Sequence, residues 1–96
     1  MSLASIRREI DLVDRQVTRL LKKRMKLAER IGKLKEKKGL PIYAPGRHQQ
    51  VLQNILRENR GVIEKDLLRE IYRGIMWATR AQQSHNAKKT QKRPRR

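Results

Sequence analysis

The fold is decided by residues 2–38, which read SLASIRREIDLVDRQVTRLLKKRMKLAERIGKLKEKK. This stretch contains no proline and a single glycine, Gly32. Its apolar residues recur at alternating steps of three and four, a spacing that predicts a helix with one apolar seam of period 3.5. The seam consists of Leu3, Ile6, Ile10, Val13, Val17, Leu20, Leu27, Ile31 and Leu34.

A helix of this length has a consequence for assembly. At about 1.5 Å per residue it would extend roughly 50 Å, which is longer than a small globular domain is wide. The 96-residue chain cannot cover the whole seam with its own remaining residues. We therefore predict a homo-oligomer, most simply a homodimer, in which the long helices cover each other's seams.

Two shorter helices are predicted after the long one. Gly39 and Pro41 end the first helix, since glycine suits the position after a helix and proline blocks its continuation. A second helix is expected from about Pro45 to Asn59, with Val51, Leu52, Ile55 and Leu56 on one face, and a third from about Ile63 to Ser84. The buried stripe expected for the third helix is Leu67, Leu68, Ile71, Tyr72, Ile75 and Met76.

No segment resembles a strand, so the predicted fold is all-α, with a three-helix subunit over residues 1–84. The last part of the chain, residues 85–96, holds six basic residues, no acid and no apolar periodicity. This composition is typical of a disordered basic tail.

The charge of the chain narrows the classes of function. It has 26 Lys and Arg against 9 Asp and Glu, a net charge of +17, so it should attract anions. The absence of cysteine excludes disulfides and thiol chemistry, and two histidines make a metal site unexpected. No apolar run approaches the ~18 residues of a membrane span, and the first residues lack the apolar core of a signal peptide. We therefore expect a cytoplasmic protein without a metal ion.

Arg24 occupies a position at which the seam predicts an apolar residue. A buried arginine is costly unless a carboxylate or another anion meets it, so either an ion pair or an internal anion site would explain it. Lys35 lies three turns later, within about 20° of Arg24 around the axis and roughly 16 Å along it. Arg7 lies about 25 Å before Arg24, too far to serve the same site within one chain.

The other two helices also carry polar residues in line with their apolar faces. Arg47 and His48 begin the two rows of the second helix, where a cation opposes the helix dipole unless an anion is bound. Thr79 and Gln83 continue the stripe of the third helix. No glycine-rich phosphate loop, histidine cluster or Ser/His/Asp set is present, so the candidate site is a helical pocket of cations with one amide. Such a pocket can bind a polyanion and stabilise developing negative charge without proton transfer.

Several segments in collinear order over residues 3–84 resemble the all-helical (AroQ-type) chorismate mutases. The segments are IRREIDLVD at 6–14, LLKKR at 20–24, AERIGKLK at 28–35, LPIYAPGR at 40–47 and TRAQQ at 79–83, where the family has Ser-x-x-x-Gln. The resemblance implies an intertwined homodimer of three-helix subunits that rearranges chorismate to prephenate without a cofactor. It also implies that each of two equivalent sites borrows one arginine across the interface.

The same resemblance assigns roles by position. Arg7 of the other subunit and Arg24 would bind the substrate carboxylates, and Lys35 and Gln83 would hydrogen-bond the ether oxygen. Arg47 would orient the ring region and Thr79 would replace the family serine. Asp14 would orient neighbouring cations. These roles make Arg24, Lys35 and Gln83 the expected catalytic residues and Arg7, Arg47, His48 and Thr79 the expected substrate-binding residues.

The chain departs from the family pattern at Ala44 and His48, where the family usually has acids that help to read the ring hydroxyl. His48 could replace the glutamate as a neutral hydrogen-bond partner. Two related activities therefore stay open, an isochorismate pyruvate lyase and a 4-amino-4-deoxychorismate mutase. A basic helical nucleic-acid-binding protein is the alternative from another class, favoured by the charge but not by the three aromatic residues or by any basic-region pattern.

Overall fold

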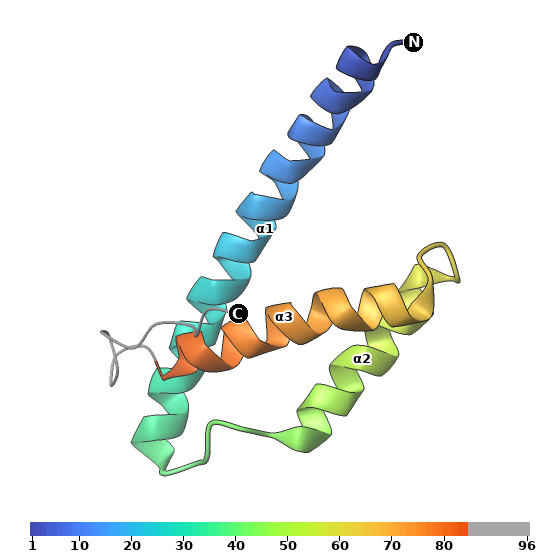
Figure 1. Cartoon of the computed structure of the whole chain (residues 1–96). Coiled ribbons are helices and arrows are strands. Elements are labelled where there is room, and N and C mark those ends of the chain that lie inside the picture. The colour runs from blue at the N-terminus through green and yellow to red at the C-terminus, as the bar shows by residue number, and fades with distance from the viewer. Residues whose placement is uncertain (85–96) are drawn as a thin grey trace, which may run out of the picture.

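The structure, a computed structural model, describes residues 1–84 and shows three α-helices (Figure 1). They are α1 at Leu3–Lys38, α2 at Pro45–Asn59 and α3 at Lys65–Gln83. The described part of the chain contains no strand, so the all-α, three-helix prediction is confirmed. The prediction of a disordered tail concerns residues outside those that the structure describes. None of the described helices has the length and apolar character needed to cross a membrane.

The ends of α1 follow from short-range hydrogen bonds. Ser2 and Ser5 form a capping box, in which each side chain accepts a hydrogen bond from the other residue's backbone N–H. At the other end Gly39 adopts a left-handed conformation with φ 70°, and the N–H of Leu40 donates to the carbonyl of Lys35 at 2.8 Å. The helix therefore begins one residue later than Ser2 and ends where the sequence predicts.

α3 is shorter than predicted because its N-terminal side is taken up by a turn. The side chain of Asn59 accepts from the N–H of Ile63 at 2.9 Å and donates to the carbonyl of Ile63 at 2.8 Å. Glu64 then caps the helix by accepting from the N–H of Asp66. The prediction of a helix from Ile63 to Ser84 is therefore wrong by two residues at its start and one at its end. α2 has the predicted bounds.

α3 crosses the C-terminal half of α1 and packs against both α1 and α2, as Figure 1 shows. The face of α1 that it covers contains Leu21, Met25, Ala28 and Gly32, of which Ala28 and Gly32 are buried. This face differs from the apolar seam, which lies on another side of α1. A small alanine and a glycine one turn apart allow α3 to lie close to the α1 backbone.

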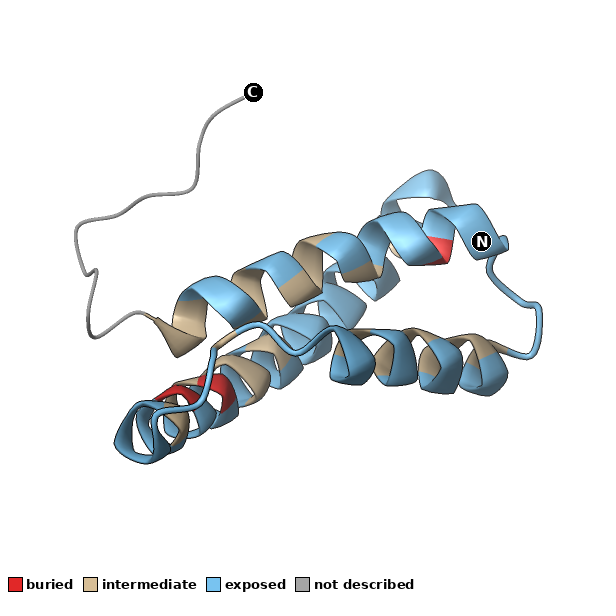
Figure 2. Ribbon diagram, turned by 90° about the horizontal axis from the view of Figure 1, so that it is seen from below, coloured by how far each residue is buried: buried red, intermediate tan, exposed pale blue. Residues whose placement is uncertain are grey.

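The seam itself is exposed along its whole length in the single chain, as the pale blue of most of α1 in Figure 2 shows. Ala28 and Leu68 are the only buried hydrophobic residues in the described chain. On α3 the predicted stripe is only partly correct, because Leu68 is buried and Tyr72, Ile75 and Met76 are half-buried, while Leu67 and Ile71 are exposed. The predicted face of α2 is half-buried throughout. One chain thus leaves most of its apolar helix faces in solvent.

Candidate functional site

All three helices contribute to one cavity of about 460 Å³. It lies between the C-terminal half of α1, the loop that precedes α2, the first turns of α2 and the second half of α3. This volume falls in the range of pockets that hold small molecules. Its lining residues are Arg24, Ile31, Lys35, Ile42, Tyr43, Ala44, Arg47, His48, Val51, Arg73, Met76, Trp77, Thr79, Arg80 and Gln83.

α1 contributes two half-buried cations, Arg24 and Lys35, from the same side of the helix. The ammonium group of Lys35 donates to the backbone carbonyl of Ile42 at 2.7 Å. This bond ties the loop after α1 to the helix and holds the lysine at the edge of the cavity. Arg24 forms no hydrogen bond or ion pair with any residue from 1 to 84, so its guanidinium donors are available to a ligand.

The first turn of α2 brings Arg47 and His48 to the same cavity. Arg47 is exposed, and its guanidinium donates to the side-chain oxygen of Gln50 at 2.7 Å. His48 is half-buried, with its ring edge-on to Tyr43 at 6.3 Å between centroids. No side chain caps α2, because its N-cap residue is Ala44. The first turn of α2 also has no acid, so the positive end of the helix faces the cavity uncompensated.

α3 contributes Thr79 and Gln83 near its C-terminal end. The Thr79 hydroxyl donates to the carbonyl of Ile75 at 2.8 Å, which leaves its oxygen able to accept. The side-chain oxygen of Gln83 is buried and has no hydrogen-bond partner among the described residues. A buried amide group without a partner is costly, and a half turn of the amide would present its N–H₂ there instead. Gln83 is therefore poised to hydrogen-bond a ligand.

The position of Gln83 depends on Gly32, which is not among the residues predicted for the site. A Cβ atom at Gly32 would lie 2.0 Å from the backbone oxygen of Gln83. Only a residue without a side chain therefore allows the end of α3 to lie at this distance from α1. A second contact at the same crossing is the hydrogen bond from the Gln82 amide to the Glu29 carboxylate. The signal in the sequence is the only glycine of α1, one turn after Ala28.

The cavity has a strongly positive lining. Five of its residues are Lys or Arg, and no Asp or Glu is among the described residues that line it. Two of the five, Arg73 and Arg80, were missed by the sequence analysis because both look like surface charges of α3. Arg80 lies with its guanidinium carbon 4.4 Å from the centre of the Tyr43 ring, a cation–π contact between two residues that line the cavity. The side chain of Arg73 pairs with Glu70 at 3.3 Å.

The structure thus brings together six of the seven residues predicted for the site. Arg7 is the exception, because it does not line the cavity and lies on the exposed N-terminal end of α1, the blue end that projects away from the other two helices in Figure 1. This separation agrees with the distance expected from the helix rise. The residues that share the cavity are Arg24, Lys35, Arg47, His48, Thr79 and Gln83.

This arrangement favours one kind of chemistry. Several cations around a small space bind a multiply charged anion, and positioned N–H donors stabilise negative charge that develops during a reaction. The described lining has no carboxylate that could act as a partner in acid–base catalysis or bind a cationic group.

Comparison with known proteins gives the site a context. The family described as chorismate mutase type II matches residues 6–84 of the chain. The bifunctional chorismate mutase/prephenate dehydratase of Aquifex aeolicus is 44% identical over 80 residues, which are 79% of this chain and 22% of that protein. The T-protein of Haemophilus influenzae is 37% identical over 90 residues, which are 93% of this chain and 24% of that protein. The chain therefore spans less than a quarter of the length of these relatives.

Proposed function

Because the chain belongs to the chorismate mutase type II family, we propose that it catalyses the Claisen rearrangement of chorismate to prephenate. The reaction is intramolecular, so the protein has to hold one compact conformer and stabilise charge while the ether bond breaks. The observation that carries the proposal is the single cavity lined by Arg24, Lys35 and Gln83. Two cations and an amide without a neighbouring carboxylate suit a reaction that needs charge stabilisation and no proton transfer.

Lys35 and Gln83 are the proposed donors to the ether oxygen. Lys35 is held at the edge of the cavity by its bond to the Ile42 carbonyl, and an ammonium group has two further N–H donors. Gln83 reaches the cavity from α3, with the buried end of its amide unpartnered. Lys35 is in place before substrate enters and Gln83 needs only a half turn of its amide, so little reorganisation is needed as negative charge develops on the oxygen.

Arg24 and an Arg7 side chain from a second copy are the proposed binders of the two carboxylates. Arg24 has free donors in the cavity, whereas Arg7 of the same chain lies far from it. The exposed seam of α1 supports pairing of two chains, because an uncovered apolar row of this length is unfavourable in water. A homodimer that pairs the long helices would bring each Arg7 to the partner's cavity and complete two equivalent sites.

The remaining proposed contacts concern the ring and its substituents. Arg47, at the positive end of α2, would orient the ring region. The Thr79 hydroxyl would turn from the Ile75 carbonyl to donate to a substrate carboxylate. His48 would contact the ring hydroxyl, since the family acids are absent at positions 44 and 48. We propose the cytoplasm as the site of the reaction, which as a pericyclic step requires neither a cofactor nor a metal ion.

The lack of a carboxylate in the cavity bears on the alternatives. A 4-amino-4-deoxychorismate mutase would have to accept an ammonium group among five cations, which is unfavourable. An isochorismate pyruvate lyase would use the same cations, and analysis of the products formed from chorismate and isochorismate distinguishes it from a mutase.

The decisive experiment follows the ultraviolet absorbance of chorismate. The variants Arg24→Met and Lys35→Met should each lower kcat/KM by about 10²–10³-fold, because each removes a cation from the reacting region. Arg30→Met and Lys33→Met on α1 are matched controls, since both residues are exposed and do not line the cavity. Unchanged activity in the first pair, or equal losses in both pairs, would contradict the proposed site.

A further inference from the structure

One face of α1 carries a continuous row of cations that the proposed reaction does not use. We call this row the basic stripe. It starts at Arg15, ends at Lys37, and contains seven residues that follow one another at steps of three or four. Every one of these positions is Lys or Arg, and every one is exposed. The stripe consists of Arg15, Arg19, Lys22, Lys26, Arg30, Lys33 and Lys37.

The stripe is narrow and straight. At 100° per residue the seven side chains fall within about 80° of the helix circumference, and they extend for about 33 Å along the axis. No acid or apolar residue interrupts it, because the carboxylates of the same half of α1, Glu29 and Glu36, lie to one side of the row. None of the seven cations forms an ion pair within residues 1–84.

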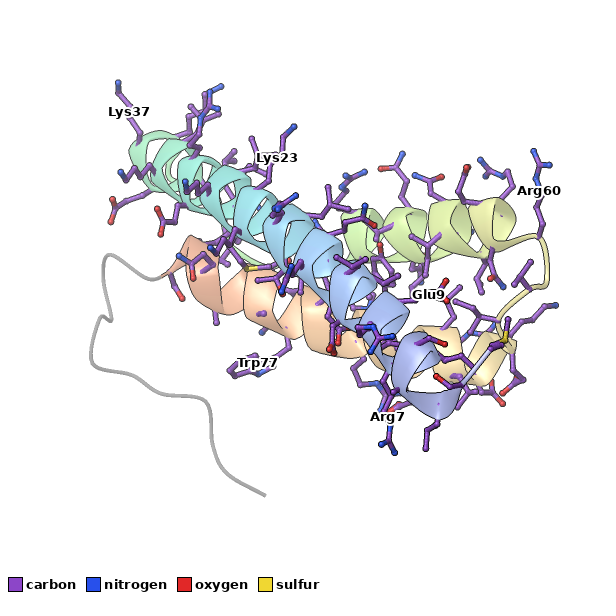
Figure 3. The ribbon with its side chains drawn as sticks, turned by 90° about the horizontal axis from the view of Figure 1, so that it is seen from above. Arg7, Glu9, Lys23, Lys37, Arg60 and Trp77 are labelled. Carbon is purple, nitrogen blue, oxygen red and sulfur yellow. The ribbon has the colours of Figure 1, made fainter. Side chains whose placement is uncertain are left out.

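The stripe lies on a side of α1 that neither lines the cavity nor contacts α3. Arg24 and Lys35, which face the cavity, lie on roughly the opposite side of the helix. Ala28 and Gly32, which are covered by α3, also lie well away from the stripe. Figure 3 shows Lys37, the last member of the stripe, pointing away from α3. The apolar seam lies on the same side of α1 as Arg24, roughly opposite the stripe. Pairing of two chains through the seam would therefore leave the stripe in solvent.

Such a row is unusual for a surface that only contacts water. Solvated helix faces commonly alternate acids and bases, since like charges three or four residues apart repel each other. Here each cation has another cation as its neighbour on the row. A bound polyanion would remove that repulsion along the whole face.

We propose that the basic stripe binds the phosphate backbone of a nucleic-acid duplex. Its length is close to one turn of a DNA duplex, about 34 Å, and its charges occur every 4.5–6 Å, a linear array facing a linear polyanion. An acidic protein surface fits less well, because protein interfaces have an apolar or aromatic centre and this face has none. A membrane fits less well too, because the stripe has no apolar side chain to insert. Contacts to phosphate alone would make the binding independent of sequence.

The test compares two triple variants of the full chain that have the same net charge. Arg19→Gln, Lys26→Gln and Arg30→Gln remove three charges from the stripe, and Arg57→Gln, Lys65→Gln and Arg69→Gln remove three exposed charges from α2 and α3. Residues 85–96 are present in both. Binding to a fluorescein-labelled 20-base-pair DNA duplex is measured by anisotropy at several NaCl concentrations. Circular dichroism and chorismate turnover show that each variant is folded, and neither should change with the stripe substitutions.

For the unmodified chain we expect the logarithm of the binding constant to fall linearly with the logarithm of salt concentration. Losing three phosphate contacts should make that slope shallower by about 2.7 and weaken binding more than tenfold at low salt, while the α2/α3 variant should keep the original slope. Equal losses in the two variants would overturn the proposal, since net charge alone would then explain binding. No binding of the unmodified chain at low salt would overturn it as well. The proposal would also be overturned if the stripe variant bound phosphatidylserine vesicles more weakly than the unmodified chain but bound the DNA duplex equally well.

Discussion

Gly32 and Gln83 show how one residue without a side chain positions another that faces the cavity. The backbone of α3 lies against Gly32, so the end of α3 and the amide of Gln83 reach the cavity that Lys35 also lines. Periodicity alone does not reveal this pair, because Gly32 belongs to the α3-facing side of α1 and the apolar seam to another side. The seam break at Arg24, in contrast, is visible in the sequence, since an arginine interrupts an otherwise regular apolar row.

The close approach at Gly32 leads to a prediction for Gly32→Ala. The new methyl group would meet backbone atoms of Gln83, so α3 has to shift, and we expect a cost of about 1–3 kcal/mol in unfolding free energy. A shift of the order of 1 Å at Gln83 should also lower kcat/KM by about 10²-fold. Urea denaturation and chorismate turnover measure the two effects.

Gly74→Ala is the matched control, because a methyl group there meets no atom within 4 Å. Replacing a glycine inside a helix should raise the unfolding free energy by about 0.5–1 kcal/mol with little change in activity. If the two variants behaved alike, the close contact at Gly32 would have no role in positioning Gln83.

A second prediction concerns Gln83→Leu. This variant replaces a buried amide that lacks a partner by an apolar group of similar size, so the unfolding free energy should stay the same or rise by about 1 kcal/mol. Activity should nevertheless fall by about 10²–10³-fold, since the proposed donor to the ether oxygen is lost.

Gln82→Leu serves for comparison in the same measurements. It removes the hydrogen bond to Glu29 and should cost about 0.5–1.5 kcal/mol while leaving most of the activity. A Gln83→Leu variant that lost stability but kept full activity would argue against a role of this amide in catalysis.

Local signals predict the helices well, and contacts between helices account for the differences. Gly39, Pro45 and Asn59 mark boundaries that the structure confirms, because each acts through its own backbone conformation or a bond to a near neighbour. The cation–π contact of Arg80 with Tyr43 joins residues that are distant in sequence, and no periodic pattern contains it. Leu67 and Ile71 fit the apolar spacing of α3 but are exposed in the single chain. Whether such a residue is buried depends on which helix packs against it, and the sequence of α3 alone does not contain that information.

The uncapped start of α2 gives a prediction at the same scale. Ala44→Ser should raise the unfolding free energy by about 1 kcal/mol, because a serine hydroxyl can accept a hydrogen bond from the free N–H groups of the first turn. Denaturation with urea measures the change. Ala81→Ser, exposed in the last turn of α3 where no free N–H groups await a cap, is the control and should bring no gain in stability. A serine at position 44 that brought no gain would mean that the free N–H groups of α2 are already satisfied.

At the scale of the whole molecule, α1 gives the subunit its elongated shape and leaves it with a large uncovered apolar surface. The described chain is 54 Å long in its largest dimension, and residues 6–20 of α1 are all exposed. With only Ala28 and Leu68 as buried apolar residues, one chain has too little core to account for a stable fold by itself. In the proposed homodimer the second chain would cover the exposed seam, and Arg7 of each chain would reach the cavity of the other.

Mixing two inactive variants tests this shared site. Arg7→Ala and Arg24→Ala should each abolish most activity alone, because every site of either homodimer lacks one arginine. Unfolding and refolding an equal mixture should restore about a quarter of the original activity, since half of the dimers are mixed and each has one intact site. Refolding an equal mixture of Arg24→Ala and Lys35→Ala is the control. Because one chain supplies both residues to its own cavity, every cavity in that mixture lacks one of them and no activity should return. Failure of the first mixture to recover activity would contradict a site completed by Arg7 of the second copy.

The projecting half of α1 also has a consequence for the lifetime of a newly made chain. A helix segment that packs against nothing unfolds and refolds on a sub-microsecond to microsecond timescale, so its backbone is repeatedly open to cleavage. Arg7, Arg8, Arg15 and Arg19 place several trypsin-type cleavage points within it. Under the proposed pairing, chains that meet a second copy quickly would escape degradation, and unpaired chains would be removed. The cellular amount of the protein would then rise more steeply than its rate of synthesis.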